Sequence, residues 1–232
     1  MSNIVTIENI TKCYGKKVVL DKLSLTIESG RIIGLLGENG VGKTTLLKIL
    51  ADLCKPEKGT ILISGKPLSS QTHSEVSFML DISNLYSWMR ILHAINYYND
   101  MFPDFDKEKA LSLCKQFNLN VKEYVQLLSK GNQERVLLML TISRKVPLYL
   151  LDEPIAGVDP RMKKSIIQII LANIPEDSTV LIASHLLRDL EEIFDEILIL
   201  NGHKLISISA DDIREQYHQS VEDYYMEVTQ NA

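Results

Sequence analysis

Apolar and polar residues alternate along the first part of the chain. Residues 4–10 (IVTIENI) and 18–29 (VVLDKLSLTIES) carry apolar side chains at about every second position, which is typical of strands with one buried face. Residues 31–36 (RIIGLL) are almost all apolar, as expected for a central strand covered on both sides. Residues 59–65 and 75–80 are also predicted to be strands.

Helical spacing of apolar residues begins in residues 43–53 (KTTLLKILADL) and dominates the middle of the chain. Further helices are predicted at residues 88–102, 107–117, 131–145, 160–174 and 185–194. Strands are predicted between and after the later helices, at residues 148–154, 178–184 and 196–202. This alternation predicts an α/β fold with a mainly parallel sheet covered by helices, an antiparallel N-terminal β layer and an inserted helical lobe.

Composition and charge narrow the class of protein. With 232 residues, of which 45% are hydrophobic and 24% charged, the chain can form one large globular domain. A net charge of −5 argues against broad nucleic-acid binding. Neither a signal peptide nor an apolar run of about 18 residues is present, so we expect a cytoplasmic protein that meets a membrane only through a partner. The widely spaced Cys13, Cys54 and Cys114 are expected to be buried thiols.

A glycine-rich turn lies between the predicted central strand and the first helix. Residues 37–45 (GENGVGKTT) match the pattern G-x-x-x-x-G-K-[ST] through Gly37, Gly42, Lys43 and Thr44. Such a turn points backbone N–H groups at phosphate oxygens, and the helix N-terminus adds partial positive charge. Lys43 would bind the β and γ phosphates and Thr44 would ligate Mg²⁺. The alternative is a glycine turn that only caps a helix.

Two acidic residues end the strand LYLLDEP at residues 148–154. A phosphate loop requires a carboxylate for Mg²⁺ at the end of a neighbouring strand, and Asp152 has this position. Glu153 would then face the γ phosphate, where it could accept a proton from an attacking water. A solvated Asp-Glu turn closed by Pro154 is the alternative.

The helix within residues 127–140 (LLSKGNQERVLLML) begins with a glycine in its first turn. Ser129 is a plausible N-cap, and the free N–H groups that follow it could bind an anion. Gly131 costs backbone entropy that alanine would not, so its presence calls for an explanation. An ordinary capped helix with a glycine in its first turn remains the alternative.

These motifs together resemble the ATP-binding-cassette (ABC) ATPases, in which a signature LSGGQ lies between the phosphate loop and the acidic strand. Leu128, Ser129 and Gly131 match the signature, whereas Lys130 and Asn132 replace a glycine and the final glutamine. The resemblance implies a P-loop NTPase with a RecA-like core and β layer at residues 1–87 and 147–232 and a helical subdomain at residues 88–146. It also implies two head-to-tail subunits, in which each signature contacts the γ phosphate held by the other subunit.

The resemblance assigns roles residue by residue. Glu153, His185 and Lys43 would be catalytic, with His185 contacting the γ phosphate as the switch histidine. Thr44, Asp152 and Asp81 would hold Mg²⁺. The nucleotide would be contacted by Tyr14, Gly37, Glu38, Asn39, Gly40, Val41, Gly42, Lys43, Thr44, Thr45, Ser129, Gly131 and Asp159.

Some of these matches have alternatives. Tyr14 stands where the family stacks an aromatic ring on adenine, but it could be an ordinary exposed loop residue. Asp159 matches the loop that links the two nucleotide sites and also has the position of a helix N-cap before Pro160. Asp81 replaces the usual glutamine, so it either reaches Mg²⁺ through water or only ties down its loop. The aromatic-rich segment 84–102 could form a groove for a partner's cytoplasmic helix or pack within the helical lobe.

The resemblance implies the ATP-binding and ATP-hydrolysing subunit of an ABC transporter. Such a subunit works on the inner face of the cell membrane with a separate transmembrane permease subunit, as a homodimer or as a heterodimer with another ABC ATPase. The short chain resembles bacterial exporters of peptide antibiotics and bacteriocins. The alternative is a soluble ABC ATPase that drives assembly or remodelling without transport.

Overall fold

The computed structural model describes residues 2–69, 72–79, 85–86, 88–185, 187–202 and 204–230. The alternating N-terminal segments form a four-stranded antiparallel sheet in the order β2-β1-β4-β5. Its strands are β1 (Asn3–Tyr14), β2 (Lys17–Glu28), β4 (Lys58–Ile63) and β5 (Lys66–Pro67). The predicted antiparallel layer is therefore a sheet of its own.

The apolar segments form a second sheet of six strands in the order β10-β9-β3-β8-β7-β6. Its strands are β3 (Ile32–Leu36), β6 (Val76–Phe78), β7 (Leu148–Asp152), β8 (Thr179–Ala183), β9 (Glu196–Asn201) and β10 (Lys204–Ser209). Strands β6, β7, β8, β3 and β9 run parallel, which confirms the predicted parallel core sheet. Strand β10 pairs antiparallel with β9 in a hairpin that the hydrophobic pattern did not reveal.

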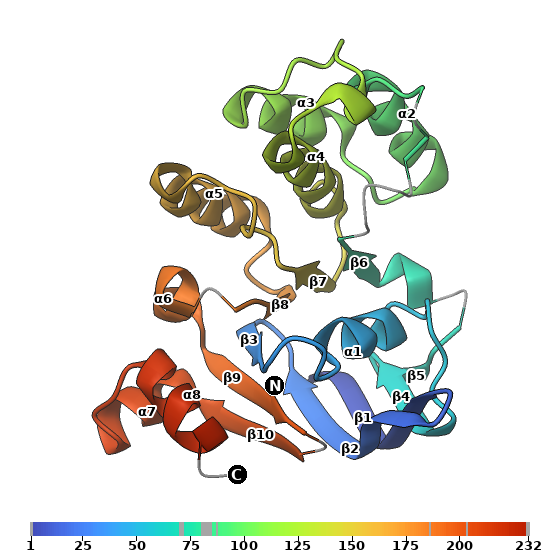
Figure 1. The fold of residues 1–232 in the computed structure, drawn as a ribbon. Coiled ribbons are helices and arrows are strands. Elements are labelled where there is room, and N and C mark those ends of the chain that lie inside the picture. The colour runs from blue at the N-terminus through green and yellow to red at the C-terminus, as the bar shows by residue number, and fades with distance from the viewer. Residues whose placement is uncertain are drawn as a thin grey trace.

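Helices connect the parallel strands. The α-helices are α1 (Lys43–Leu50), α2 (Ile91–Met101), α3 (Lys107–Gln116), α4 (Lys130–Ile142), α5 (Pro160–Asn173), α6 (Leu187–Leu190), α7 (Ala210–Gln216) and α8 (Val221–Gln230). Short 3₁₀ turns are η1 (Thr72–Ser74), η3 (Val125–Leu127) and η4 (Glu191–Ile193). Helices α2, α3 and α4 gather at one end of the molecule, far from α7 and α8 (Figure 1). The helix predicted at 185–194 is shorter, and α7 and α8 were not predicted.

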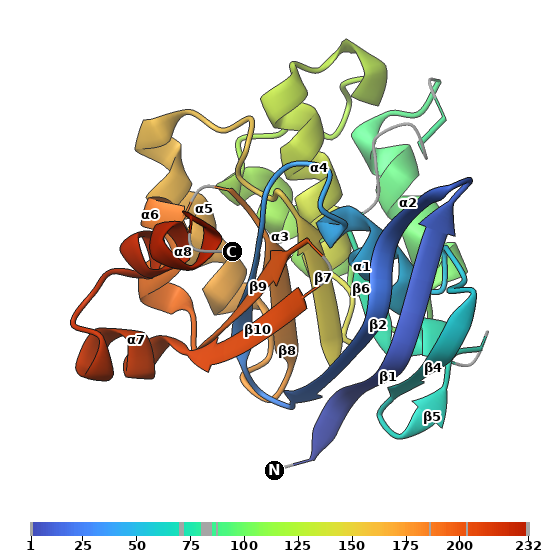
Figure 2. The same cartoon turned by 60° about the horizontal axis from the view of Figure 1, so that its bottom comes forward.

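Helix α1 lies between the two sheets, and the views in Figure 1 and Figure 2 agree on this placement. Its leucine and isoleucine side chains are fully buried, at positions Leu46, Leu47, Ile49 and Leu50. They pack in one cluster with inward-facing residues of both sheets. Because burial of apolar area stabilises the fold, this packing holds the N-terminus of α1 against the ends of the parallel strands.

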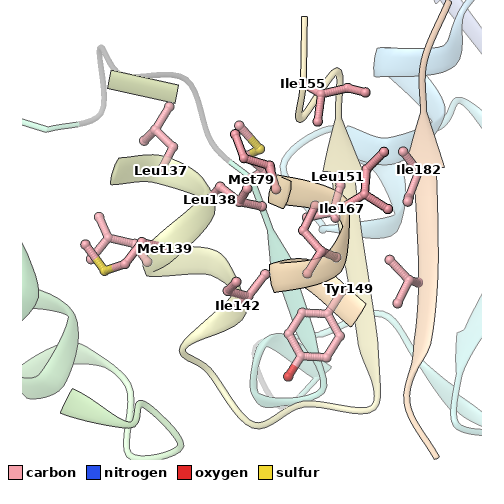
Figure 3. Close-up of a cluster of buried hydrophobic side chains, with 14 of the residues drawn as sticks. Met79, Leu137, Leu138, Met139, Ile142, Tyr149, Leu151, Ile155, Ile167 and Ile182 are labelled. Atoms are coloured by element: carbon pink, nitrogen blue, oxygen red, sulfur yellow. The ribbon is translucent and has the colours of Figure 1, made fainter. Parts of the chain in front are cut away.

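A second apolar cluster joins the helical segment to the parallel sheet. The C-terminal half of α4 packs with residues of β7, β8 and α5 (Figure 3). Leu138, Met139, Tyr149 and Ile182 in this cluster have no exposed area. Close packing of this kind couples the position of α4 to that of β7, the strand that ends in Asp152.

The cysteines differ from expectation in part. Cys114 is buried on α3, and burial raises the pKa of its thiol to about 11. Cys13, in β1, and Cys54, in the segment after α1, are only half-buried. Within the described residues, the structure has no helix long and apolar enough to cross a membrane.

Candidate functional site

The turn between β3 and α1 can be built only with glycine at two positions. Gly37 has a φ of +153° and Gly42 has a φ of +123°. A Cβ atom on Gly37 would lie 2.5 Å from the carbonyl oxygen of Leu200, and one on Gly42 would lie 2.9 Å from Cγ1 of Val19. The loop is therefore pressed against β9 and β2, and its backbone can curl around an anion.

Lys43, the first residue of α1, is only 7% exposed. Its ammonium donates hydrogen bonds to the carbonyl oxygens of Gly37, at 2.6 Å, and Glu38, at 3.1 Å. Burial lowers the pKa of Lys43, and the nearby Glu153 and Asp152 oppose that shift. A buried cation held at the mouth of a glycine loop is suited to phosphate oxygens.

Thr44 and Asp152 come together from α1 and β7. The Thr44 hydroxyl donates a hydrogen bond of 2.7 Å to Oδ2 of Asp152. Burial raises the pKa of the Asp152 carboxyl, and the bond from Thr44 opposes the shift. The described part of the chain has no cluster of three or more His, Cys, Asp or Glu residues suited to a metal. One hydroxyl and one carboxylate fit Mg²⁺ when a bound nucleotide supplies phosphate oxygens.

Glu153 occupies a strained backbone position directly after β7. Its φ is +49°, a conformation that is uncommon for residues other than glycine and is found at functional sites. Its N–H donates to the carbonyl oxygen of Ala183 at 2.8 Å. Its carboxylate lies 2.8 Å from Nδ1 of His185 and accepts a hydrogen bond of 3.2 Å from Ser184. Adjacent parallel strands, β7 and β8, thus bring an acid and a histidine together.

A pocket of about 400 Å³ contains much of the predicted nucleotide site. It is lined by Tyr14, Lys17, Val19, Asn39, Gly40, Gly42, Lys43, Thr44, Thr45, Asp152 and Glu153. Tyr14 is 52% exposed at the end of β1, so its ring is accessible for stacking. Lys17 and Val19 were not predicted. Their place three and five residues after Tyr14, at the start of the next strand, is the only signal that could have indicated them.

The remaining loop residues support the turn rather than line the pocket. The N–H of Val41 donates to the carbonyl oxygen of Glu38 at 3.3 Å. A Cβ on Gly37 would also meet the Val41 side chain at 2.8 Å. Glu38 therefore contributes its carbonyl oxygen both to this turn and to Lys43.

Ser129, Gly131 and Asp159 lie outside the described lining of this pocket. Ser129 is the N-cap of α4, and its hydroxyl accepts a bond of 3.4 Å from the N–H of Asn132. Asp159 is the N-cap of α5 and accepts a bond of 2.9 Å from the N–H of Arg161. The two helix starts form a second group of candidate residues, separate from the phosphate loop.

The aromatic segment divides into two faces. Ile91, Ile95 and Tyr98 of α2 are buried in the core of the helical segment. Tyr86 and Trp88 are 58% and 60% exposed, and their rings stack with centroids 5.9 Å apart. The packing alternative therefore holds for part of the segment, and the groove for a partner's helix stays a prediction for the exposed part. Asp81 lies outside the described residues.

Known proteins resemble this chain along nearly all its length. The family model described as ABC transporter matches residues 20–156, which is more than half of the chain. The ABC transporter ATP-binding protein YcbN of Bacillus subtilis is 32% identical over 229 residues, covering 96% of this chain and 75% of the relative. The SkfA peptide export ATP-binding protein SkfE of Bacillus subtilis is 30% identical, covering 88% of this chain and 87% of the relative.

Two further comparisons concern an export system and a solved fold. The lipopolysaccharide export system ATP-binding protein LptB of Haemophilus influenzae is 29% identical and covers 88% of this chain and 90% of its own length. The solved structure of an ATP-binding subunit of an ABC transporter superposes with a TM-score of 0.87 at 22% identity, over 97% of this chain and 99% of that chain. At this identity the likeness shows the fold.

Proposed function

The chain belongs to the ABC transporter family as an ATP-binding subunit that hydrolyses ATP to energise transport, and from this premise we propose that it drives export through separate transmembrane subunits. Subunits of this family act with membrane partners and dimerise. The peptide-export relative SkfE favours a peptide as the exported cargo. The working position of the chain is then the inner face of the cell membrane.

In this proposal the pocket beside the phosphate loop binds ATP. Tyr14 stacks on the adenine, and the loop N–H groups and Lys43 bind the phosphates. Thr44 and Asp152 would hold Mg²⁺, which would neutralise developing charge on the phosphate oxygens. The Thr44–Asp152 contact supports this assignment because it already places both oxygen ligands side by side.

Glu153 is the proposed general base. Its carboxylate orients the attacking water and accepts the proton released as the water oxygen bonds to the γ phosphorus, while the bond from this phosphorus to the β–γ bridging oxygen breaks and ADP leaves. His185 orients this carboxylate and contacts the γ phosphate. The distance of 2.8 Å between Nδ1 of His185 and Oε1 of Glu153 supports the pairing of these two residues. Ser184 adds a second hydrogen bond to the same carboxylate.

The observation that carries the dimeric mechanism is the separation of Ser129 from its own phosphate-loop pocket. A capped helix start with free N–H groups can bind a phosphate, and in this proposal a second ATP-binding subunit supplies that phosphate. Two subunits placed head to tail then enclose two ATP molecules. Loss of the γ phosphate removes charge-assisted bonds to both subunits, so hydrolysis loosens the pair.

The exposed aromatic surface at Tyr86 and Trp88 is the proposed contact for the transmembrane subunit. Two stacked rings that are more than half exposed provide apolar area at the surface that a partner could cover. This surface belongs to the helical segment that carries Ser129. Docking of the transmembrane subunit on this surface would couple the ATP-driven closure of the dimer to the permease.

Cysteine cross-linking tests the head-to-tail arrangement. In a background lacking the three native cysteines, Glu153→Gln protein carrying Ser129→Cys and Asn39→Cys should form covalent dimers when Mg-ATP is added. Glu153→Gln keeps ATP bound by slowing hydrolysis, so the dimer persists. Thr60→Cys, on the exposed side of β4, replaces Asn39→Cys in the control pair and should give no ATP-dependent dimer. Full ATP turnover by strictly monomeric protein would contradict the proposal.

A further inference from the structure

The start of α4 is in direct contact with the loop that follows Glu153. Oε2 of Glu134 accepts a hydrogen bond of 2.9 Å from the backbone N–H of Gly157. A Cβ atom on Gly157 would lie 2.2 Å from the same oxygen, so any other residue here would displace this carboxylate. The contact joins two segments that are 23 residues apart in sequence.

A second contact lies one turn earlier on the same helix. A Cβ atom on Gly131 would lie 2.8 Å from the carbonyl oxygen of Gly157. The absence of a side chain at Gly131 therefore lets the loop carbonyl approach the helix backbone. This contact explains a glycine in the first turn of a buried helix, because alanine would push the loop away.

The loop held by Glu134 is itself joined to the proposed base. The N–H of Ala156 donates to the carbonyl oxygen of Glu153 at 3.2 Å. Ile155, between them, is fully buried in the cluster of Figure 3. A displacement of Gly157 is thus passed to the backbone of Glu153, whose strained φ makes its carboxylate direction sensitive to the turn.

Helix α4 begins at the Ser129 cap and also carries Glu134, the residue that contacts the loop. Ser129 caps its first turn, and Glu134 follows about 8 Å along the axis, at 1.5 Å per residue. The C-terminal half of the helix is buried in the core and cannot shift independently of its start. A displacement of Ser129 therefore also displaces Glu134, because the helix moves as one rigid body.

We infer that Glu134 is a positioning residue that couples the two nucleotide sites of the dimer. When the partner's ATP binds at Ser129, α4 settles in one position, and the bond from Glu134 to Gly157 aligns Glu153 for hydrolysis of the ATP in its own subunit. The inference rests on the proposed head-to-tail dimer. In this inference, ATP binding at one nucleotide site changes the alignment of Glu153 in the other site through the Glu134–Gly157 contact.

Steady-state ATP hydrolysis by the full chain tests this role. Glu134→Ala should lower kcat about 10-fold, while KM for ATP stays within about twofold of wild type and the thermal midpoint falls by no more than about 4 °C. Glu134→Gln, whose amide oxygen can still accept the Gly157 N–H, should keep at least about half of the wild-type kcat. Glu108→Ala, an exposed acid on α3, is the matched control and should leave kcat unchanged.

A double-mutant cycle separates positioning from general damage. Gly157→Ala should act like Glu134→Ala, because its methyl group displaces the carboxylate, and the double variant should be no worse than either single variant. Wild-type kcat in Glu134→Ala, equal loss in Glu134→Gln, or additive losses in the double variant would each overturn the inference. Failure of the underlying dimer would show instead as absent ATP-dependent cross-linking with Glu134 intact.

Discussion

Nδ1 of His185 lies 2.8 Å from Oε1 of Glu153, although the two residues are 32 positions apart. Parallel pairing of β7 with β8 ends both strands at the same edge of the sheet and produces this contact. The imidazole can therefore hold the carboxylate in one direction before substrate binds. In our proposal this preorganisation serves proton removal from water.

Removing the His185 ring should therefore slow catalysis more than it weakens binding. We expect His185→Ala to lower kcat about 100-fold, because the base loses its orienting partner and the γ phosphate loses a donor. The measurement is phosphate release at saturating Mg-ATP, alongside binding of a fluorescent ATP analogue. His73→Asn is the control, since the His73 imidazole lies 3.3 Å from the Asp52 carboxylate and does not line the phosphate-loop pocket. Unchanged turnover in His185→Ala would remove the residue from the mechanism.

Replacement of Lys43 should affect nucleotide affinity. Lys43→Ala removes a buried positive charge that faces the proposed phosphate position, and hydrogen bonds to charged groups contribute about 1.5–3 kcal/mol. We expect ATP to bind about 10- to 100-fold more weakly, as measured by calorimetry. Lys48→Ala, on the exposed face of the same helix, should retain wild-type affinity. Equal affinities of all three proteins would show that Lys43 does not contact the phosphates.

Asp152 should make stability depend on pH. Because burial raises its pKa, the folded state binds this proton more tightly than the unfolded chain does. Its contribution to stability is then greatest below the ordinary aspartate pKa and is lost as the pH rises through the raised value. Asparagine does not ionise, so Asp152→Asn does not lose this stability as the pH rises. Without nucleotide, the variant should be increasingly more stable than wild type as the pH rises above the ordinary aspartate pKa of about 4, until the pH has passed the raised pKa.

Thermal unfolding at several pH values measures that difference. The same variant should gain little stabilisation from added Mg-ATP, because the carboxylate that holds the metal is gone. A constant stability difference across the pH range would contradict the buried carboxylate. Full stabilisation of Asp152→Asn by Mg-ATP would contradict its role toward Mg²⁺.

The exposed aromatic pair should matter only to the membrane partner. Trp88→Ala should weaken association with the transmembrane subunits about 30-fold, since loss of a large aromatic contact at an interface costs about 2 kcal/mol. ATP hydrolysis by the isolated chain should be unchanged. Co-purification from membranes and phosphate release provide the two measurements. Met226→Ala, an exposed apolar residue of α8, is the control. Equal recovery of both variants with the membrane subunits would argue against this docking surface.

The sequence by itself determined the class of fold and the phosphate-loop chemistry. A strand, a glycine turn and a helix follow one another directly in residues 32–50, so their local geometry is encoded in contiguous residues. The same holds for the acidic end of β7 and for the caps Ser129 and Asp159. The boundaries of the helical subdomain at 88–146 stay a prediction.

Only the tertiary structure decided which of these residues meet. The pairing of Glu153 with His185, and of Glu134 with Gly157, depends on strand order and helix packing, which no local pattern specifies. The strained φ of Glu153, directly after β7, was likewise not indicated by any local pattern. Gly131 is the clearest case, because its lack of a side chain is explained by a carbonyl 26 positions away. Hydrophobic periodicity specifies which face of an element is buried, whereas contacts between elements arise only when those faces pack together.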